Sequence, residues 1–422
     1  MGMKSFTQKL ALTTALVSSI ALGAISAQAE PTAEVLHYWT SGSEAKAVKA
    51  LKEDFEANGG KWVDAPVAGG GGDAQAAVLR SRVLSGNPPA AVQIKGLSIQ
   101  EWAEADALGD LTKLGEEEGW DNVLPPLLQD IVKHDGKYVA VPVNIHRVDW
   151  IWANPESLAK VGGEPPRTWE EFNVLADKLQ AAGITPLAHG GQPWQDGTVF
   201  ETVVLGMGGA EFFNKAFVEK DPATLKSDTM KKVFDQMRKM RGYVDADFSG
   251  RDWNLATSMV MRGEAAMQIM GDWAKGEFLA AGKVPGKDFL CVPTPSKGGY
   301  ILNSDSFAMF NVTSDDDKAG QQLLARLILG EKFQETFNLY KGSIPARMGV
   351  STEKFDECAV KSMVDLQSAS ESGALVGSMA HEIAAAGAVR GAILDVVTEH
   401  FNSDMTSDVA VERLAEAVEL AE

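Results

Sequence analysis

The stretch Val35-Leu36-His37-Tyr38-Trp39 predicts a buried strand, because its residues are almost all apolar or aromatic and it is short. The turn Thr40-Ser41-Gly42 follows directly, and apolar residues at helical spacing then predict a helix over 44–55. This first part of the chain therefore forms a strand, a turn and a helix.

The same alternation continues along the chain. Strands are expected over 62–67 and 88–94, a helix follows the glycine run and ends near residue 83, and another covers 99–107. Such alternation is typical of a mostly parallel sheet flanked by helices, so the predicted fold class is α/β.

The middle of the chain begins a second unit. A strand over 138–145 is expected to make the first crossing into it. The segment Pro165-Pro166-Arg167-Thr168-Trp169-Glu170-Glu171-Phe172 then starts a helix, with Thr168 as cap and Glu171 completing a capping box. Trp169, Phe172, Ala176 and Leu179 share one face of that helix. A chain of 422 residues is long enough for two lobes, each with its own core.

The N-terminus has the features of a signal peptide. Lys4 and Lys9 give a basic start, an apolar run covers 10–25, and Ala27-Gln28-Ala29 is a small-x-small cleavage site before Glu30. No later stretch has eighteen uninterrupted apolar residues, so the mature chain is expected not to span a bilayer. We therefore predict export, with residues 1–29 removed after Ala29, and a soluble mature protein.

Charge and cysteine content narrow the function further. The net charge is −19, and loss of the two leader lysines makes it more negative, which argues against nucleic acid or an anionic membrane as partner. The chain has two cysteines, Cys291 and Cys358. In an exported protein they predict a disulfide, with two separate buried thiols as the alternative.

The sequence carries no motif for catalysis, a metal or a cofactor. The glycine run Gly69–Gly72 before Asp73 has no Gly-Lys-Ser/Thr ending, so we expect a turn that faces a cleft rather than a phosphate loop. His381-Glu382 is not followed by a second histidine at zinc-helix spacing, and no G-x-S-x-G motif occurs. No catalytic residue, metal site or cofactor is predicted, although a carboxylate pair of the glycosidase kind stays open.

Several of the ten tryptophans lie beside turn residues. Trp39 precedes a turn, Trp194 follows Gln192-Pro193, and Trp273 follows Gly271-Asp272. Indole faces placed at strand ends suit the C–H-rich face of a sugar ring, with polar groups around its hydroxyls. The remaining tryptophans considered are assigned to the core: Trp62, Trp102, Trp120 and Trp169.

Two segments carry a family resemblance. Pro166–Phe172 and Ala265-Ala266-Met267-Gln268-Ile269-Met270-Gly271-Asp272-Trp273 resemble the carbohydrate-binding (family 1) extracellular solute-binding proteins of bacterial ABC importers, closest to the glucose/mannose-binding members. The resemblance implies a two-lobed, periplasmic-binding-protein-like (type II) fold with hinge strands and a ligand cleft between the lobes. The implied lobes are 30–141 with 304–345, and 142–303 with 346–422.

The resemblance also implies the ligand contacts. They are Trp39, Glu44, Lys95, His146, Trp194, Trp273, Asn303, Asp305, Lys341 and His381. Lys95 and Lys341 would donate charge-assisted hydrogen bonds, and Glu44 and Asp305 would accept them from hydroxyls. Asn144, Arg147, Asp149 and Gln192 either contact the sugar or only shape the hinge. His146 and His381 stand where oligosaccharide binders carry aromatics, which favours a short, deep site and a monosaccharide.

The function expected from these features is that of a periplasmic receptor, not an enzyme. It would bind an aldohexose such as glucose as a monomer and deliver it to the permease of an ABC transporter. The alternatives are a different hexose, a disaccharide or a polyamine as ligand, or a secreted glycoside hydrolase. Ferric iron is disfavoured, since the five tyrosines include no adjacent pair. A polycation would be repelled by Lys95 and Lys341.

Overall fold

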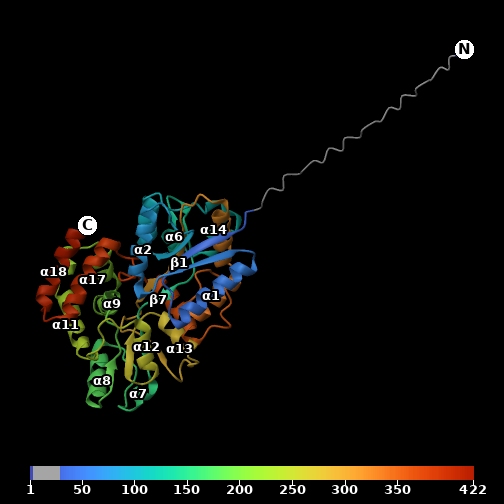
Figure 1. Ribbon diagram of the computed structural model, residues 1–422. Helices are drawn as coiled ribbons and strands as arrows, with labels where there is room; N and C mark the ends of the chain where they lie inside the picture. Colours follow the sequence, from blue (N-terminus) through green and yellow to red (C-terminus); the bar gives the residue numbers. More distant parts are fainter. Residues whose placement is uncertain (3–28) are drawn as a thin grey trace.

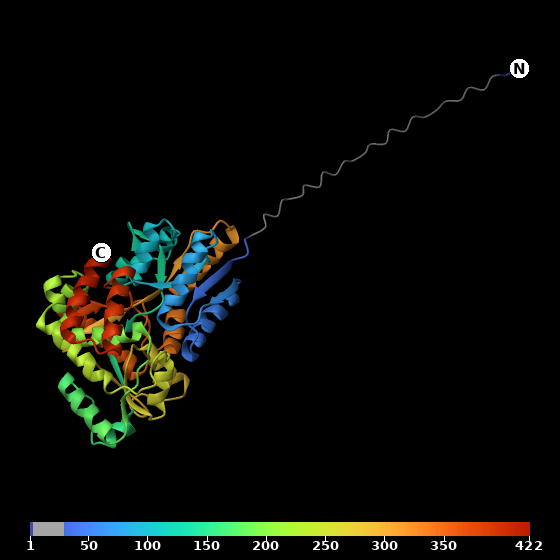
Figure 2. The ribbon, with the colours of Figure 1, turned by 60° about the vertical axis from the view of Figure 1, so that its left-hand side comes forward.

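The computed structural model describes residues 1–2 and 29–422. Most of the predicted signal peptide, residues 3–28, lies outside the described residues, so cleavage after Ala29 stays a prediction. From residue 29 onward the chain builds two α/β lobes, with the short strand β7 (His146–Arg147) between them (Figures 1 and 2).

The first lobe is built on a five-stranded sheet. Its strands, in spatial order, are β2 (Lys61–Pro66), β1 (Thr32–His37), β3 (Ala91–Lys95), β13 (Asp305–Met309) and β6 (Ala140–Pro142). β1 pairs in parallel with β2 and β3, whereas β13 returns from the far end of the chain and runs antiparallel to β3 and β6. The sequence-predicted strands and helices of this lobe are confirmed, with ends shifted by up to three residues.

Helices and short elements cover the first sheet. They are α1 (Gly42–Ala57), the 3-10 turn η1 (Gly70–Gly72), α2 (Asp73–Leu84), α3 (Leu97–Glu104), α4 (Thr112–Glu117), α5 (Trp120–Val123), α6 (Pro126–Val132), β4 (Lys133–His134), β5 (Lys137–Tyr138), α14 (Asp315–Ile328) and α15 (Glu331–Lys341). α1, α2, α6 and α14 lie around β1 (Figure 1). Apolar side chains from these helices and the sheet form one continuous buried core.

The second lobe is built on a four-stranded sheet and a group of long helices. The sheet order is β11 (Leu290–Pro293), β8 (Trp150–Ala153), β10 (Ala265–Ile269) and β9 (Thr185–Leu187). The helices near the sheet are α7 (Pro155–Ala159), α8 (Trp169–Ala181), α12 (Trp253–Met261) and α13 (Trp273–Ala280). Those gathered beyond it are α9 (Pro193–Phe217), α10 (Pro222–Leu225), α11 (Asp228–Arg241), α17 (Gly387–Asn402) and α18 (Ser407–Ala421) (Figure 1).

A third, three-stranded sheet lies between the lobes. β12 (Tyr300–Asn303) pairs in parallel with β14 (Leu375–Gly377) and antiparallel with β7, and α16 (Glu357–Ser372) packs beside it. The chain crosses between the lobes after β6, between β12 and β13, and after α15. Two of these crossings pair through Ile145 and Ile344, whose backbone groups exchange hydrogen bonds of 2.8 and 3.0 Å.

Two local predictions need correction. The strand expected over 138–145 is broken into β5 and β6, because β5 pairs with β4 whereas β6 pairs with β13. The chain leaves the first sheet after Val143, whose N–H still donates to the carbonyl oxygen of Asp305. At the start of α8 the Thr168 side chain accepts the Glu171 N–H as predicted. The Glu171 carboxylate, however, accepts the N–H of Arg167 at 2.7 Å rather than that of Thr168. The capping box therefore differs from the standard one in its second bond, because the Glu171 carboxylate reaches the N–H of the residue before the cap.

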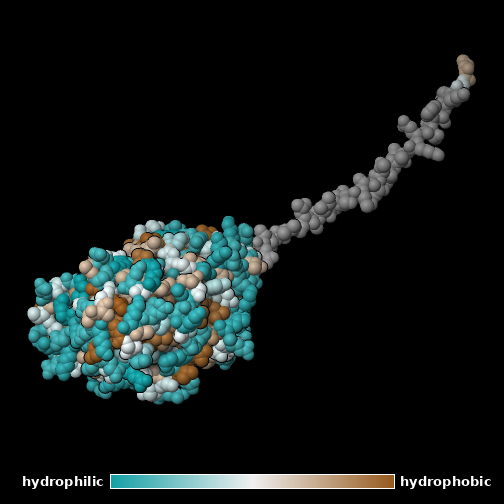
Figure 3. Space-filling view, turned by 90° about the horizontal axis from the view of Figure 1, so that it is seen from below, coloured by the Kyte–Doolittle hydropathy of each residue, from teal (hydrophilic) through white to brown (hydrophobic). Residues whose placement is uncertain are grey.

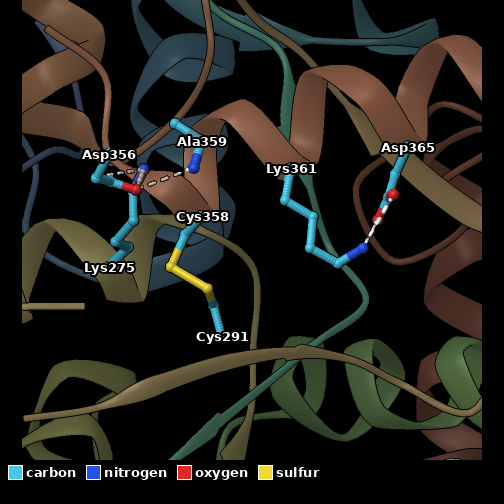
Figure 4. The surroundings of a disulfide bond; sticks show 7 residues. All are labelled: Lys275, Cys291, Asp356, Cys358, Ala359, Lys361 and Asp365. Atoms are coloured by element: carbon cyan, nitrogen blue, oxygen red, sulfur yellow. Dashed lines mark hydrogen bonds and ion pairs between the residues drawn. A yellow bond between two sulfur atoms is a disulfide. The ribbon is translucent and has the colours of Figure 1, made fainter. Parts of the chain in front are cut away.

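The two cysteines form a disulfide. Cys291 of β11 and Cys358 of α16 are bonded, with their Cα atoms 6.0 Å apart, so the prediction of a bridge is confirmed (Figure 4). Lys275 lies close by and pairs with Asp356 at 3.0 Å, and Asp356 also accepts the N–H of Ala359 at the start of α16. These bonds fasten α16 to the second lobe.

The surface is mostly polar. Hydrophilic side chains cover most of the face in Figure 3, with apolar ones in small separate groups. Within residues 1–2 and 29–422, no helix has the length and apolar character needed to cross a membrane.

Candidate functional site

A cavity opens where strand ends and helix starts of the two lobes meet; we call it the interlobe cavity. Its lining consists of Tyr38, Trp39, Glu44, Gly70, Gly71, His146, Trp194, Trp253, Trp273, Asn303, Asp305, Lys341 and His381. Nine of the ten residues predicted to contact ligand are in this set. The tenth, Lys95, is one contact away, because its Nζ donates to the carbonyl oxygen of Gly71 at 2.8 Å.

Aromatic rings form much of the wall. The ring centroid of Trp273 lies 6.3 Å from that of Trp194, 5.1 Å from that of His381 and 5.2 Å from that of His146. Trp39 has a double role: it lines the cavity, and it also packs in the first core, 5.7 Å from Phe307. The cavity thus presents flat apolar faces of the kind that suit ring C–H groups.

The glycine run closes one side of the cavity. A Cβ placed on Gly70 would lie 3.0 Å from the rings of Trp194 and Trp253, and one on Gly71 would lie 2.8 Å from Trp194. Gly71 also has φ +81°, which favours glycine. The predicted turn therefore does face the cleft, and its glycines allow the backbone of the first lobe to rest on two indoles of the second.

A buried carboxylate forms the polar centre. Asp305 accepts hydrogen bonds from Gln93 Nε2 at 3.0 Å, Asn144 Nδ2 at 3.1 Å and His146 Nε2 at 3.0 Å. The other ring nitrogen of His146 bonds Asp272 of the second lobe. Burial acts to raise the pKa of Asp305, but the hydrogen bond and charge of His146, with Lys341 and Lys95, bring the pKa below its ordinary value. Asp305 is therefore ionised.

The pKa of His146 moves the other way. Burial acts to lower it, but the charge of Asp272 and the hydrogen bonds to both carboxylates raise the pKa above its ordinary value. His146 consequently holds a positive charge between an aspartate from each lobe.

Two lysines bring positive charge to the cavity. Lys341 Nζ is bonded to Glu44 Oε1 at 2.9 Å and lies 5.6 Å from the centroid of Trp39. Lys95 Nζ lies 5.4 Å from the Tyr38 ring, and burial lowers its pKa. Both ammonium groups have several N–H donors, so each can bond a ligand hydroxyl besides its protein partner.

Two further side chains keep polar atoms unused. Asn303 Oδ1 is buried and has no hydrogen-bond partner among residues 29–422. His381 bonds Ser378 through Nδ1 at 2.8 Å, while its Nε2 makes no hydrogen bond within the same described part of the chain. Burial, with the positive charges of Lys95 and Arg390, sets the pKa of His381 well below its ordinary value, so the ring is neutral. Polar atoms without a protein partner in a cavity are available to bond a ligand.

Some predicted neighbours do not line the cavity. Arg147 is buried against Asp149, with both nitrogen–oxygen distances 3.1 Å, and also bonds Asp365, so it supports the hinge. Gln192 accepts the indole N–H of Trp194 at 2.8 Å and orients that ring. Asn144 does not line the cavity, but its side-chain amide donates to Asp305 and holds that carboxylate in place.

Larger hollows on the surface lack these features. The groove between α1 and α15 has a volume of about 600 Å³, but its charged groups are exposed and paired with each other, as Lys332 is with Asp54. The interlobe cavity is the hollow whose polar groups are buried and convergent, which is typical of a binding site.

Comparison with known proteins places the chain in a family. Residues 39–328 match the family described as bacterial extracellular solute-binding protein. The chain belongs to this family. A binding protein of Rhizobium meliloti, named "Probable sugar-binding periplasmic protein", is 51% identical over 97% of this chain and 99% of its own. One of Brucella melitensis with the same name is 52% identical over 94% of both chains.

Solved structures agree on the fold. A chitin oligosaccharide binding protein superposes with a TM-score of 0.77 at 20% identity, covering 92% of this chain and 98% of its own. The bacterial solute receptor AcbH gives 0.74 at 16% identity, covering 93% and 98%. The predicted family and the two-lobed fold are confirmed, and with them the prediction of a binding protein rather than an enzyme.

Sequence reasoning missed some cavity residues of this binding protein. Trp253 was not singled out, although Asp252-Trp253 at the start of α12 repeats the Asp272-Trp273 pattern at the start of α13. Tyr38 belongs to the predicted first strand, yet its ring lines the cavity and its hydroxyl donates to Asp305 Oδ1 at 3.5 Å. The repeated Asp-Trp helix start is the signal that could have identified Trp253.

The binding protein is closed tightly around the cavity, whose volume is about 30 Å³. That is room for water-sized molecules rather than a sugar ring. A larger ligand requires the lobes to part or the lining side chains to shift.

Proposed function

We propose that this binding protein captures an aldohexose, with glucose as the leading candidate, in the interlobe cavity and delivers it unchanged to an ABC importer. The names of the relatives, which are sugar-binding periplasmic proteins, support this proposal at the level of the ligand class. The choice of a hexose rests on the residues of the cavity.

The observation that carries the proposal is the meeting of aromatic faces and polar groups from both lobes in one cavity. Trp273 and Trp194 offer flat apolar surfaces from the second lobe. Asp305, Glu44 and Lys341 bring acceptors and donors from the first. A pyranose has C–H faces and a rim of hydroxyls that each donate and accept, so it matches both kinds of surface.

The cavity favours a single sugar ring. His146 and His381 are packed edge-on or tilted against Trp273, and thereby fill space that a second ring would need. A polyamine is disfavoured because Lys95 and Lys341 would repel it. A hydrolase is disfavoured because both oxygens of Asp305 are engaged by neighbouring side chains and its pKa is low, so it holds no proton to donate to a leaving group.

The same proposal includes how the protein works. The lobes, 30–141 with 304–345 and 142–303 with 346–422, would open at the hinge strands and close around the sugar. The mature protein would act as a periplasmic monomer after cleavage behind Ala29, and its closed form would be recognised by the permease.

Isothermal titration of residues 30–422 tests the ligand. Glucose, mannose, galactose, xylose, maltose and putrescine are titrated separately into unliganded protein, with D305N as a matched variant that removes one buried charge. We expect saturable heat with one or more hexoses and strong weakening in the variant. Absence of heat with every mono- and disaccharide would contradict the proposal, and release of reducing ends from oligosaccharides would favour the hydrolase.

A further inference from the structure

A carboxylate behind the cavity holds the loop that carries His381. Glu201 lies fully buried within α9. Its Oε2 accepts the N–H groups of Met379 at 2.7 Å and Ala380 at 3.1 Å, and its Oε1 is 2.7 Å from Ser378 Oγ. Ser378 Oγ in turn lies 2.8 Å from His381 Nδ1 and accepts the His381 backbone N–H at 3.1 Å.

Counting hydrogens along this chain of contacts determines the state of the imidazole. Ser378 has one hydroxyl hydrogen and two lone pairs. When Glu201 is a carboxylate it only accepts, so the Ser378 hydroxyl donates to it. The oxygen of Ser378 must then accept from His381 Nδ1, which therefore carries the hydrogen. Nε2 of the neutral ring is left with a lone pair.

A proton on Glu201 reverses the order. Oε2 already accepts two N–H groups, so the proton resides on Oε1 and is donated to Ser378. The Ser378 hydroxyl hydrogen then turns to His381 Nδ1, and the ring hydrogen resides on Nε2. Both arrangements satisfy the carboxyl group of Glu201, the hydroxyl group of Ser378 and Nδ1 of His381. They leave Nε2 free as an acceptor when Glu201 is ionised and as a donor when Glu201 is protonated.

We propose that Glu201 is a positioning residue that sets, through Ser378, which nitrogen of His381 carries the hydrogen, and thereby whether the ring accepts from or donates to a sugar hydroxyl. His381 lines the interlobe cavity, and its Nε2 makes no hydrogen bond with residues 29–422. The part of this inference that concerns the sugar rests on the proposed function. The relay itself does not.

Burial of Glu201 places the switch in the mildly alkaline range. Burial raises the pKa of Glu201 to about 8, against the hydrogen bonds from Ser378, Ala380 and Met379, which lower it. Above that pH the carboxylate makes Nε2 an acceptor, and below it the acid makes Nε2 a donor. The charged or titratable groups that act on the pair are Asp149 on Glu201, and Lys95, Arg390, Asp305 and His146 on His381.

Nitrogen NMR of histidine-labelled protein tests the relay directly, because protonated and bare ring nitrogens have well-separated shifts. Wild-type protein is recorded from pH 6 to 10, and a His381→Gln variant assigns the signal among the six histidines. We expect the hydrogen to move from Nε2 to Nδ1 as the pH rises. The proposal would be overturned if His381 kept one tautomer from pH 6 to 10 in wild type and in the two relay variants described in the next paragraph.

Two variants isolate the relay. In Glu201→Gln the amide oxygen must keep the two backbone N–H bonds, so its NH₂ group faces Ser378 and mimics the acid. We expect Nε2–H at every pH. In Ser378→Ala the link is absent, and the tautomer should no longer follow the ionisation of Glu201. The exposed Glu264→Gln is the matched control and should behave as wild type, since Glu264 pairs with Arg262 at the surface. A Glu201→Gln protein that still titrates like wild type would refute the relay.

Binding of deoxyfluoro sugars gives the functional readout, since fluorine accepts weakly and cannot donate. At the hydroxyl that meets His381, wild type above pH 8 should discriminate against the fluoro analogue by about tenfold, the expected loss for one hydrogen bond. Glu201→Gln should lose that discrimination at this position alone. Equal discrimination in both proteins at all positions would overturn the specificity claim. If no sugar binds at all, the proposed function fails while the NMR result still decides the relay.

Discussion

Removal of the Glu277 carboxylate should weaken ligand binding without touching the cavity. Glu277 belongs to α13 of the second lobe, and its Oε1 accepts the N–H and the O–H of Ser43 in the first lobe at 2.8 and 2.7 Å. Ser43 lies in the first turn of α1, where the helix dipole adds to the attraction for a negative charge. Because the contact joins the two lobes, parting them would break it.

The size of the effect follows from these bonds. A hydrogen bond to a charged group contributes about 1.5–3 kcal/mol. Because Glu277 is half-buried and screened by solvent, we take about 1–2 kcal/mol for the contact as a whole. If the unliganded protein is mostly open, Glu277→Ala should raise the Kd for sugar by a factor of roughly 5–30, and Glu277→Gln by less, since it keeps an acceptor.

Titration calorimetry and small-angle X-ray scattering check this expectation together. The variant should show a higher Kd and, in the absence of sugar, a radius of gyration at least as large as that of wild type. Glu264→Ala, which removes a carboxylate paired within the second lobe, is the control and should leave both quantities unchanged. A Kd for Glu277→Ala within twofold of wild type would refute the reasoning.

Three further outcomes are expected. Trp273→Ala should weaken sugar binding by about 1–3 kcal/mol in titration calorimetry. The control Trp102→Ala, which changes the first core away from the cavity, should leave binding unchanged. Equal Kd values for Trp273→Ala and wild type would remove Trp273 from the site. Serine in place of Cys358 and its partner opens a bridge across 67 residues, so unfolding monitored by calorimetry should lose about 4 kcal/mol, and an unchanged transition would argue against this role. The pKa of Asp305 is lowered on folding, so the stabilisation from Asp305 is present above about pH 4 and is lost as the pH falls further. The pKa of His146 is raised, so the stabilisation from His146 is present below about pH 6.5 and is lost as the pH rises through the raised value. Acid unfolding of D305N should therefore depend less on pH below about 4, and a pH dependence equal to that of wild type would contradict this.

The elements with strong local patterns could be predicted from the sequence. The strand that ends before Trp39 and the helix that starts at Thr168 are dictated by nearby residues, through apolar runs and a side-chain cap. The same holds for Trp169, whose burial follows from helical spacing. Such features depend on a few neighbouring positions and little else.

The site required more than local patterns. The resemblance brought residues from distant segments together, but it did not indicate that Glu201 lies behind His381, because a glutamate within an apolar helix has no local partner that marks it. Trp253 does have a local signal, the Asp-Trp helix start that it shares with Trp273, but a tryptophan at a helix start is equally compatible with the core. The break after Pro142 depends on the pairing of Ile145 with a segment two hundred residues away.

The pairing of Ile145 with Ile344 has a mechanical consequence. Backbone segments bonded side by side behave as a flat ribbon, which bends across its plane at little cost but resists sliding within it. Ser304, on the third crossing, donates its hydroxyl to the carbonyl oxygen of Asn144 at 2.7 Å, so the crossings lie side by side and we expect the lobes to rotate mainly about one axis. A transport partner would then distinguish the liganded from the unliganded protein by the angle between the lobes. A pair of fluorescent dyes placed across the cleft would report that angle as one distance.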